Sequence, residues 1–287
     1  MPHYTVAHSP DADDIFMYYA VKFGWVGSKE ITFENLALDI ETLNQKSLKS
    51  EYDICAISFA LYPHIKDEYA LLNTAASFGE GYGPKLIKKK GAKLGRRFKV
   101  ALSGEYTTNA MLFRLKYPDA RITYMNFLEI EQAVLDGTVD AGVLIHESIL
   151  TFSDKLETEA EIFDIWLDFA GENLPLPLGG MALRRSLPLN RAIECQRILT
   201  DAIRVGIAHK PLLSKMLMER NLIRVNEADL EKYLNLYANE HSVQFDDQAL
   251  KGLNTLFALG YKSGIYSEPI RAEDYLIGEQ YEALRQS

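Results

Sequence analysis

Several features that would assign the chain to a specialised class are scarce or absent. Only two cysteines occur among 287 residues, Cys55 and Cys195, and both lie in apolar segments. They are too few for a disulfide framework or a cysteine-rich metal site, so buried reduced thiols are expected. The chain also has no run of about 18 apolar residues, which argues against a membrane-spanning helix.

A signal-peptide pattern and an excess of positive charge are missing as well. Residues 1–8 contain no basic segment, apolar stretch or small-residue cleavage site, so a cytoplasmic location is expected. The formal net charge of -9 argues against nucleic acid or an anionic membrane as the partner. A small anionic molecule remains a suitable ligand, because binding it requires only local hydrogen-bond donors.

The chain does contain an alternation of strand and helix patterns. The hydrophobic fraction of 47% and the charged fraction of 25% are those of a globular protein of one large or two ordinary domains. Strands are expected at 4–8, 31–38 and 52–58, and helices at 15–23, 41–48 and 59–66. This βαβαβ order is typical of a parallel sheet with helices on its faces.

A second series of the same kind follows. It comprises expected strands at 99–102, 122–125 and 141–145, with helices at 109–116 and 127–135. In both series a helix ends, a short turn follows, and an aspartate (Asp53 or Asp140) begins a small apolar strand. This repeated pattern predicts two α/β lobes of similar build that meet at a shared cleft.

Two segments are expected to cross between the lobes. Lys85 to Lys88 leaves the first lobe, and Leu174 to Gly180 returns to it in extended form, because its prolines exclude a helix or a central strand. Residues 181–184 then form a strand, and 162–169 is a strand or a short helical turn. Amphipathic helices follow at 192–209, 227–239 and 246–262.

The predicted fold class is therefore α/β, with two lobes, an interlobe cleft and a helical C-terminal third. The first lobe comprises 1–86 and 182–287, and the second comprises 87–181. In such hinged proteins the ligand lies between the lobes and is enclosed when they close.

The strand at 141–145 ends in a titratable group, His146. It is apolar without alternation, as expected of a strand that is covered on both faces, and Glu147 and Ser148 follow. Ligands bind at the carboxyl ends of strands in open α/β sheets, so His146 is a candidate for chemistry. The alternative is that its imidazole only bonds a loop carbonyl.

Three further segments are candidates for binding. Asp11, Asp13 and Asp14 lie at the start of a helix, where Asp13 or Asp14 would cap it or favour its positive end. This role is favoured over a metal site, because no glycine and distal glutamate of a calcium loop follow. The glycine-rich stretch 79–84 is expected to line the site. Thr107 and Thr108 precede a helix whose first N–H groups would bind an anion, although plain capping is the commoner use.

In combination, these motifs resemble one family. They are Ser9-Pro10 with Asp14 and Phe16, Glu41-Thr-Leu-Asn44, Gly79-x-Gly-x-Gly-Pro84, Thr107-Thr108, Ile145-His-Glu-Ser148 and Leu174-Pro-Leu-Pro-Leu-Gly179. Over residues 4 to 260 the chain resembles the 1,4-dihydroxy-6-naphthoate synthases of the futalosine route to menaquinone. The resemblance implies a periplasmic-binding-protein-like (type II) fold working inside the cell.

The resemblance also implies a lyase activity. The family converts cyclic dehypoxanthinyl futalosine to 1,4-dihydroxy-6-naphthoate, and a sugar-derived fragment is lost. Its general base corresponds to His146. Its motifs contribute the predicted substrate-binding residues, which are Ser9, Asp14, Asn44, Ser58, Gly81, Thr107, Thr108 and Leu178. The predicted partner is a small anionic substrate, and no cofactor or metal is predicted.

One turn departs from the resemblance. The family turn usually reads Ser-Pro-Cys-Pro-Asn-Asp-Thr-Phe, whereas this chain has Ser-Pro-Asp-Ala-Asp-Asp-Ile-Phe over residues 9–16. The added carboxylates allow a divergent branch with the same reaction or a relative with a modified substrate. Two other functions stay open: a non-catalytic solute-binding protein of a transporter, and the chorismate dehydratase of the same pathway.

Overall fold

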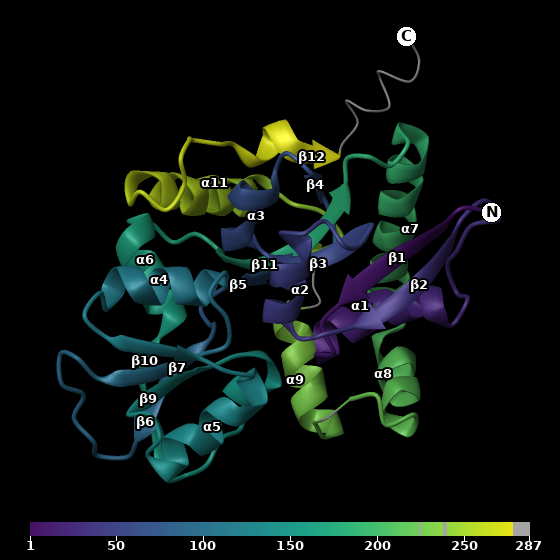
Figure 1. Cartoon of the computed structure of the whole chain (residues 1–287). Coiled ribbons are helices and arrows are strands. Elements are labelled where there is room, and N and C mark those ends of the chain that lie inside the picture. Colours follow the sequence, from purple (N-terminus) through teal and green to yellow (C-terminus); the bar gives the residue numbers. More distant parts are fainter. Residues whose placement is uncertain (224, 238–239, 278–287) are drawn as a thin grey trace.

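The chain folds into two α/β lobes, each built on its own sheet (Figure 1). The computed structural model describes residues 1–223, 225–237 and 240–277. The larger sheet runs in the order β12-β4-β11-β3-β1-β2, and β5 pairs with β11. Its strands are β1 (His3–His8), β2 (Thr32–Ala37), β3 (Ile54–Ser58), β4 (Tyr69–Leu72), β5 (Ser77–Gly79), β11 (Leu176–Arg184) and β12 (Leu276–Ile277).

The smaller sheet repeats the topology of the larger one. Its order is β10-β6-β9-β7-β8. Its strands are β6 (Lys85–Lys89), β7 (Lys99–Leu102), β8 (Arg121–Tyr124), β9 (Ala141–Leu144) and β10 (Leu156–Glu161). In the larger sheet β1 pairs in parallel with β2 and β3, and in the smaller sheet β7 pairs in parallel with β8 and β9. β3 and β9 each pair with one antiparallel strand as well. The antiparallel strand is β11 in one sheet and β6 in the other, so each lobe is completed by a segment that crosses from its neighbour.

The helices cover these sheets and form much of the C-terminal part (Figure 1). In the first part of the larger lobe they are α1 (Ala12–Lys22), α2 (Ile40–Ser47) and α3 (Tyr62–Ile65). The smaller lobe carries α4 (Thr108–Lys116), α5 (Phe127–Asp136) and α6 (Ile162–Ala170). The C-terminal part carries α7 (Leu189–Ala208), α8 (Lys210–Glu219), α9 (Glu227–Tyr237), α10 (Glu240–Val243) and α11 (Asp247–Lys262). Short 3₁₀ helices span Phe59–Leu61, His146–Ile149 and Ala272–Tyr275.

The unit of α5 and β9 shows how the local sequence builds the smaller lobe. The Asn126 side chain accepts a hydrogen bond from the backbone N–H of Leu128, which caps α5. Gly137 ends the helix in the left-handed conformation, with φ of +77°, which glycine adopts without a steric penalty. The chain then enters β9, whose four residues are all buried. Their continuous apolar run is explained by cover on both faces.

Some segments differ from the sequence-based predictions. Of the two alternatives predicted for residues 162–169, a strand or a short helical turn, the structure has the helical one, as α6, and α8 was not predicted. The segment 59–66 is a 3₁₀ turn followed by the four-residue α3 rather than one continuous helix. The predicted helix 227–239 ends at Tyr237 as far as the structure describes it, because residues 238–239 lie outside the described part.

The returning segment is also more regular than predicted. One strand, β11, includes both Pro177 and the residues 181–184. Pro177 has no N–H to donate, but there β11 extends past the end of β3 and pairs only with β5, with an irregularity between Pro177 and Gly179. A proline is therefore tolerated in a strand that is central over the rest of its length.

The lobe boundaries follow from strand membership. The sequence-based division, 1–86 with 182–287 and 87–181, stays a prediction. We propose boundaries a few residues earlier in the chain, because β6 of the smaller sheet begins at Lys85 and β11 of the larger sheet begins at Leu176. Below, "larger lobe" and "smaller lobe" refer to the parts built on the two sheets.

Candidate functional site

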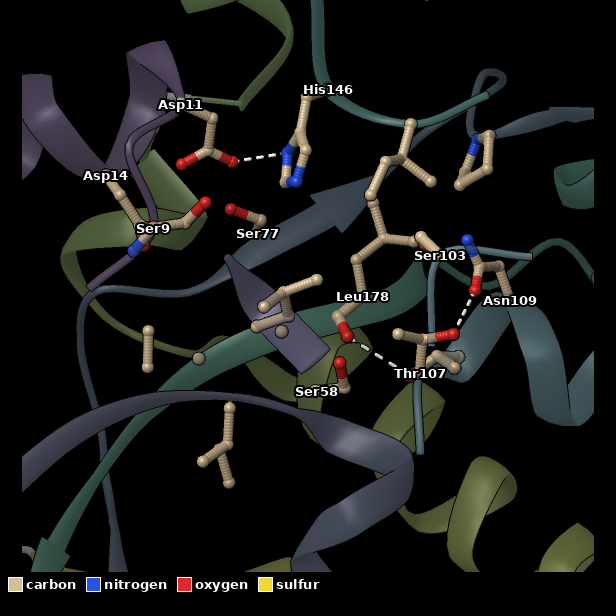
Figure 2. A pocket seen from close by; sticks show the side chains of 18 of the residues that line it. Ser9, Asp11, Asp14, Ser58, Ser77, Ser103, Thr107, Asn109, His146 and Leu178 are labelled. Carbon is tan, nitrogen blue, oxygen red and sulfur yellow. Dashed lines mark hydrogen bonds and ion pairs between the residues drawn. The ribbon is translucent and has the colours of Figure 1, made fainter. Parts of the chain in front are cut away.

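A cavity lies where the parallel strands of both lobes end (Figure 2). Ser9 directly follows β1, Ser58 ends β3, Ser103 directly follows β7, and His146 lies two residues beyond β9. All four line the same cavity, which holds about 720 Å³ of empty space, part of it open to solvent. The repeated topology therefore brings four equivalent strand ends to one place, as expected for ligand sites in α/β sheets.

Most of the predicted site residues line this cavity. They are Ser9, Asp14, Ser58, Thr107, Thr108, His146 and Leu178. Asn44 and Gly81 are not among the lining residues. Asn44 is fully buried behind the cavity wall, where its amide donates to the Ser58 hydroxyl and its oxygen accepts from the Ser58 N–H, both at 3.0 Å. Asn44 therefore fixes Ser58, while Gly81 provides a left-handed turn at φ of +73°.

His146 is held in an unusual conformation by the smaller lobe and contacts the larger one. Its φ is +55°, in the left-handed region, which costs a residue with a side chain about 1 kcal/mol. The ring of Phe127 meets its imidazole edge-to-face, with centroids 4.8 Å apart. Nδ1 of the imidazole pairs with the carboxylate of Asp11, which is 3% exposed (Figure 2). Backbone strain of this kind concentrates at functional sites.

Glu147 does not bond the imidazole but reaches the start of α1. Its Oε1 accepts a hydrogen bond from the backbone N–H of Ala12 at 2.8 Å. Of the two roles predicted for Asp14, capping of α1 is wrong, but Asp14 lies in the first turn, where its charge favours the positive end of the helix. The helix begins at Ala12 with Asp11 as N-cap and no side-chain cap bond from Asp11, while Asp14 accepts from the Ser9 N–H at 2.7 Å. The side chain of Asp13, the other predicted cap, lies outside the described part.

Burial, followed by the nearby charge of Asp11, raises the pKa of Glu147 above its ordinary value. The folded state thus keeps the Glu147 proton to a higher pH than the unfolded chain does. Raising the pH from the unfolded-state pKa to the folded-state pKa of this carboxyl therefore lowers the free energy of unfolding. Glu147→Gln retains an acceptor oxygen and should remove this part of the pH dependence. Denaturant titrations between pH 4 and 8, with Glu129→Gln on the exposed face of α5 as control, measure the difference. If the free energy of unfolding changed equally with pH in the wild type, Glu147→Gln and Glu129→Gln, the assignment would be contradicted.

The hydroxyl groups of Thr107 and Thr108 are already engaged. The Thr107 hydroxyl caps α4 by accepting from the Ala110 N–H, and it lies within hydrogen-bonding distance of Gly104 O and Asn109 Oδ1. The Thr108 hydroxyl accepts from the Ala60 N–H at 3.2 Å and donates to Leu178 O at 3.1 Å. Thr108 thus bridges the lobes, and its contribution to a ligand would come from the backbone at the start of α4.

Replacing Thr108 by valine tests this bridge. Valine has the same shape but leaves the Ala60 N–H and the Leu178 carbonyl without their partner. We expect the free energy of unfolding to fall by about 1–2 kcal/mol. Thr123→Val on the exposed β8 is the matched control and should change it little. A Thr108→Val protein as stable as the wild type in urea titration would show that the bridge contributes nothing.

Two serines that line the cavity have buried hydroxyl oxygens without a hydrogen-bond partner among the described residues. They are Ser9 and Ser103, which are 2% and 5% exposed. Ser103 belongs to the turn before α4 that the sequence marked as an anion-binding arrangement, yet it was not predicted as a site residue. Ser77, Asn109 and Tyr233 also line the cavity and were not predicted, and Asp11 of the divergent turn, a candidate segment for binding, lines it as well. For Ser103 the signal was its position directly after a parallel strand, equivalent to Ser9.

Charge is unevenly distributed around the cavity (Figure 2). Asp11 and Asp14 lie at one end, while Ser103, Thr107 and Asn109 lie at the other, at the start of α4. No lysine or arginine occurs among the described lining residues. The partial positive charge of the α4 N-terminus and neutral donors are therefore what an anionic group would meet.

Two other expectations concern metals and membranes. Within residues 1–223, 225–237 and 240–277, no group of three or more histidine, cysteine or acidic side chains could hold a metal ion. Over the same residues no helix is long and apolar enough to cross a bilayer. Cys55 and Cys195 are buried free thiols, and burial raises the pKa of both to about 12.

Comparison with known proteins decides the family. The model of a family described as menaquinone biosynthesis matches residues 4–262. The chain belongs to this menaquinone biosynthesis family. A 1,4-dihydroxy-6-naphtoate synthase of Streptomyces coelicolor is 30% identical over 87% of this chain and 91% of its own length. The enzyme of that name from Thermus thermophilus is 27% identical over 90% of this chain and 93% of its own length.

Solved structures confirm the predicted fold class. A protein of Archaeoglobus fulgidus is 33% identical, superimposes with a TM-score of 0.85, and covers 92% of this chain and 98% of its own. The ligand-binding component of an ABC-type import system from Staphylococcus aureus is 12% identical, with a TM-score of 0.70 over the whole of both chains. The second likeness concerns the fold alone: this member of the menaquinone biosynthesis family has a periplasmic-binding-protein-like architecture.

Proposed function

We propose that the chain is a lyase that converts cyclic dehypoxanthinyl futalosine to 1,4-dihydroxy-6-naphthoate. Membership of the menaquinone biosynthesis family and the names of its two relatives support the reaction. The observation that carries the proposal is the arrangement of the cavity. His146 lines the same cavity as the N-terminus of α4, so a base and an anion-binding group would face one ligand.

His146 is the proposed general base. The reaction requires removal of a proton and departure of a sugar-derived fragment, without a redox change. A neutral imidazole is suited to accept that proton near neutral pH. The substrate carboxylate would bind the first N–H groups of α4 and the buried hydroxyl of Ser103. The carboxylates of Asp11 and Asp14 would repel it from the other end, which sets the orientation of the substrate.

Contacts between the lobes would exclude water from this reaction. Thr108 bridges the lobes beneath the cavity. On another side, Glu41 of the larger lobe approaches the turn before α4, where it accepts from the Tyr106 N–H at 3.4 Å. A Cβ at Gly104 would lie 2.2 Å from the Glu41 carboxylate, so glycine permits this close approach. A cytoplasmic site of action and an anionic substrate are part of the same proposal.

The proposal is tested by offering the purified chain three candidate ligands separately. We expect cyclic dehypoxanthinyl futalosine to yield a naphthoate chromophore over many turnovers, and chorismate to yield no product. Dehydration of chorismate would instead assign the chain to the other lyase of the pathway. Tight binding of a small carboxylate, without conversion of either substrate, would favour a solute-binding protein.

A further inference from the structure

Beside His146, each lobe places one carboxylate against the other lobe. Asp11 is the N-cap residue of α1, a position whose side chain commonly accepts from the first N–H groups of the helix. Its side chain makes no such bond, and its Oδ2 pairs with His146 of the smaller lobe. Glu147 of the smaller lobe accepts from the N–H of Ala12 in its place. Because Glu147 stabilises the helix start, the Asp11 carboxylate is available to the imidazole.

The pairing determines which ring nitrogen can act as a base. A carboxylate at Nδ1 favours the tautomer that carries its proton on Nδ1, which leaves the lone pair on Nε2. In the structure Nδ1 faces Asp11, and the opposite side of the ring points away from that carboxylate (Figure 2). The edge-to-face contact with Phe127 limits rotation of the ring. The pair thus selects both the tautomer and the direction of the imidazole.

We propose that Asp11 is a positioning residue that orients His146 for proton abstraction across the interface between the lobes. The inference rests on the proposed function of His146. It gives a role to the acidic turn between β1 and α1, because Asp11 of that turn faces the imidazole. Since the two residues belong to different lobes, the oriented base forms only when the lobes meet, which couples activation of the base to enclosure of the substrate.

Asp11→Asn tests the proposal, because asparagine has nearly the same shape but no charge. With the full chain and cyclic dehypoxanthinyl futalosine, we expect kcat to fall by about tenfold or more while KM changes little. In a plot of kcat against pH, the fall of kcat on the acidic side should move to lower pH, because without the Asp11 carboxylate the imidazolium form is less favoured. Among the side chains that the structure describes, Asp14, Glu147 and Tyr233 are the other titratable groups around the ring, and all three are retained.

Two further variants make the outcome decisive. Asp246→Asn changes the N-cap aspartate of α11, which does not line the cavity and whose side chain accepts from the Ala249 N–H, and it should leave kcat and its pH profile unchanged. Asp11→Glu restores a carboxylate and should recover part of kcat. In ¹⁵N spectra of histidine-labelled protein, Asp11→Asn should shift the His146 tautomer from Nδ1–H towards Nε2–H.

Failure of the inference and failure of the proposed function give different results. If His146→Ala is inactive but Asp11→Asn has the kcat and pH profile of the wild type, the positioning role is overturned and the base assignment survives. A rise in KM alone, with an unchanged profile, also overturns it in favour of a structural role. If His146→Ala retains full turnover, the base assignment fails and the positioning role fails with it.

Discussion

His146→Ala should fold like the wild type and lose most of its turnover, by a factor of about 10² to 10⁴. The contacts of the imidazole with Asp11 and Phe127 lie beside the cavity rather than within either sheet. His146 lies at a strand end, in a left-handed conformation that alanine must also adopt, beside a cavity. Its loss removes the only imidazole among the described lining residues, whereas the start of α4 and Ser103, the proposed site for the substrate carboxylate, are retained. We therefore expect kcat to collapse while KM changes by less than about tenfold.

His3→Ala is the matched control. His3 is an exposed imidazole at the start of β1, outside the cavity, and its removal should leave kcat unchanged. Circular dichroism and urea titration of both variants verify the fold. A His146→Ala protein that is folded and retains wild-type turnover would refute the assignment of the base. Equal losses in both variants would point to a general loss of structure instead.

Gly142→Val should have the largest effect on stability, a loss of about 3 kcal/mol in the free energy of unfolding. Gly142 is in β9 beneath α5, and a Cβ there would lie 2.4 Å from Cγ2 of Ile130 and 3.1 Å from Cγ2 of Val134. Both neighbours are fully buried in α5, so neither can move without displacing the helix. Because β9 leads directly to His146, turnover should fall together with stability.

Gly95→Val separates this clash from the general effect of replacing a glycine. No atom lies within 4 Å of a Cβ at Gly95, which is exposed in the turn before β7. We expect the free energy of unfolding of Gly95→Val to lie within about 0.5 kcal/mol of the wild-type value. If Gly142→Val were equally stable in urea titration, the close packing of α5 on β9 would be incorrect.

The strand ends were predictable from sequence because they depend on local patterns. The apolar run before His146 and its counterpart before Ser58 mark buried parallel strands, and the rule that ligands bind at their carboxyl ends needs no further information. The start of α4 was likewise recognisable from Thr107 and Thr108, which follow a strand and precede a helix. These elements provide Ser58, Thr107, Thr108 and His146 of the cavity wall.

The contacts between the lobes were not predictable in the same way. The pairing of Asp11 with His146 and of Glu147 with α1 depends on how two separately folded sheets meet, which no local pattern encodes. The use of the Thr108 hydroxyl as a bridge has the same origin. Pro177 illustrates another limit: its place in a central strand depends on the length of the neighbouring β3, which the sequence of β11 does not contain.

A structure of His146→Ala bound to cyclic dehypoxanthinyl futalosine tests the proposed site most directly. The geometry predicts the intact substrate in the cavity, its carboxylate at the start of α4 beside Ser103, and its acidic C–H facing the space left by the imidazole. The reacting carbon should lie about 3–3.5 Å from the position that Nε2 occupies in the wild type. A substrate bound outside the cavity, or with its carboxylate towards Asp11 and Asp14, would contradict the proposed function.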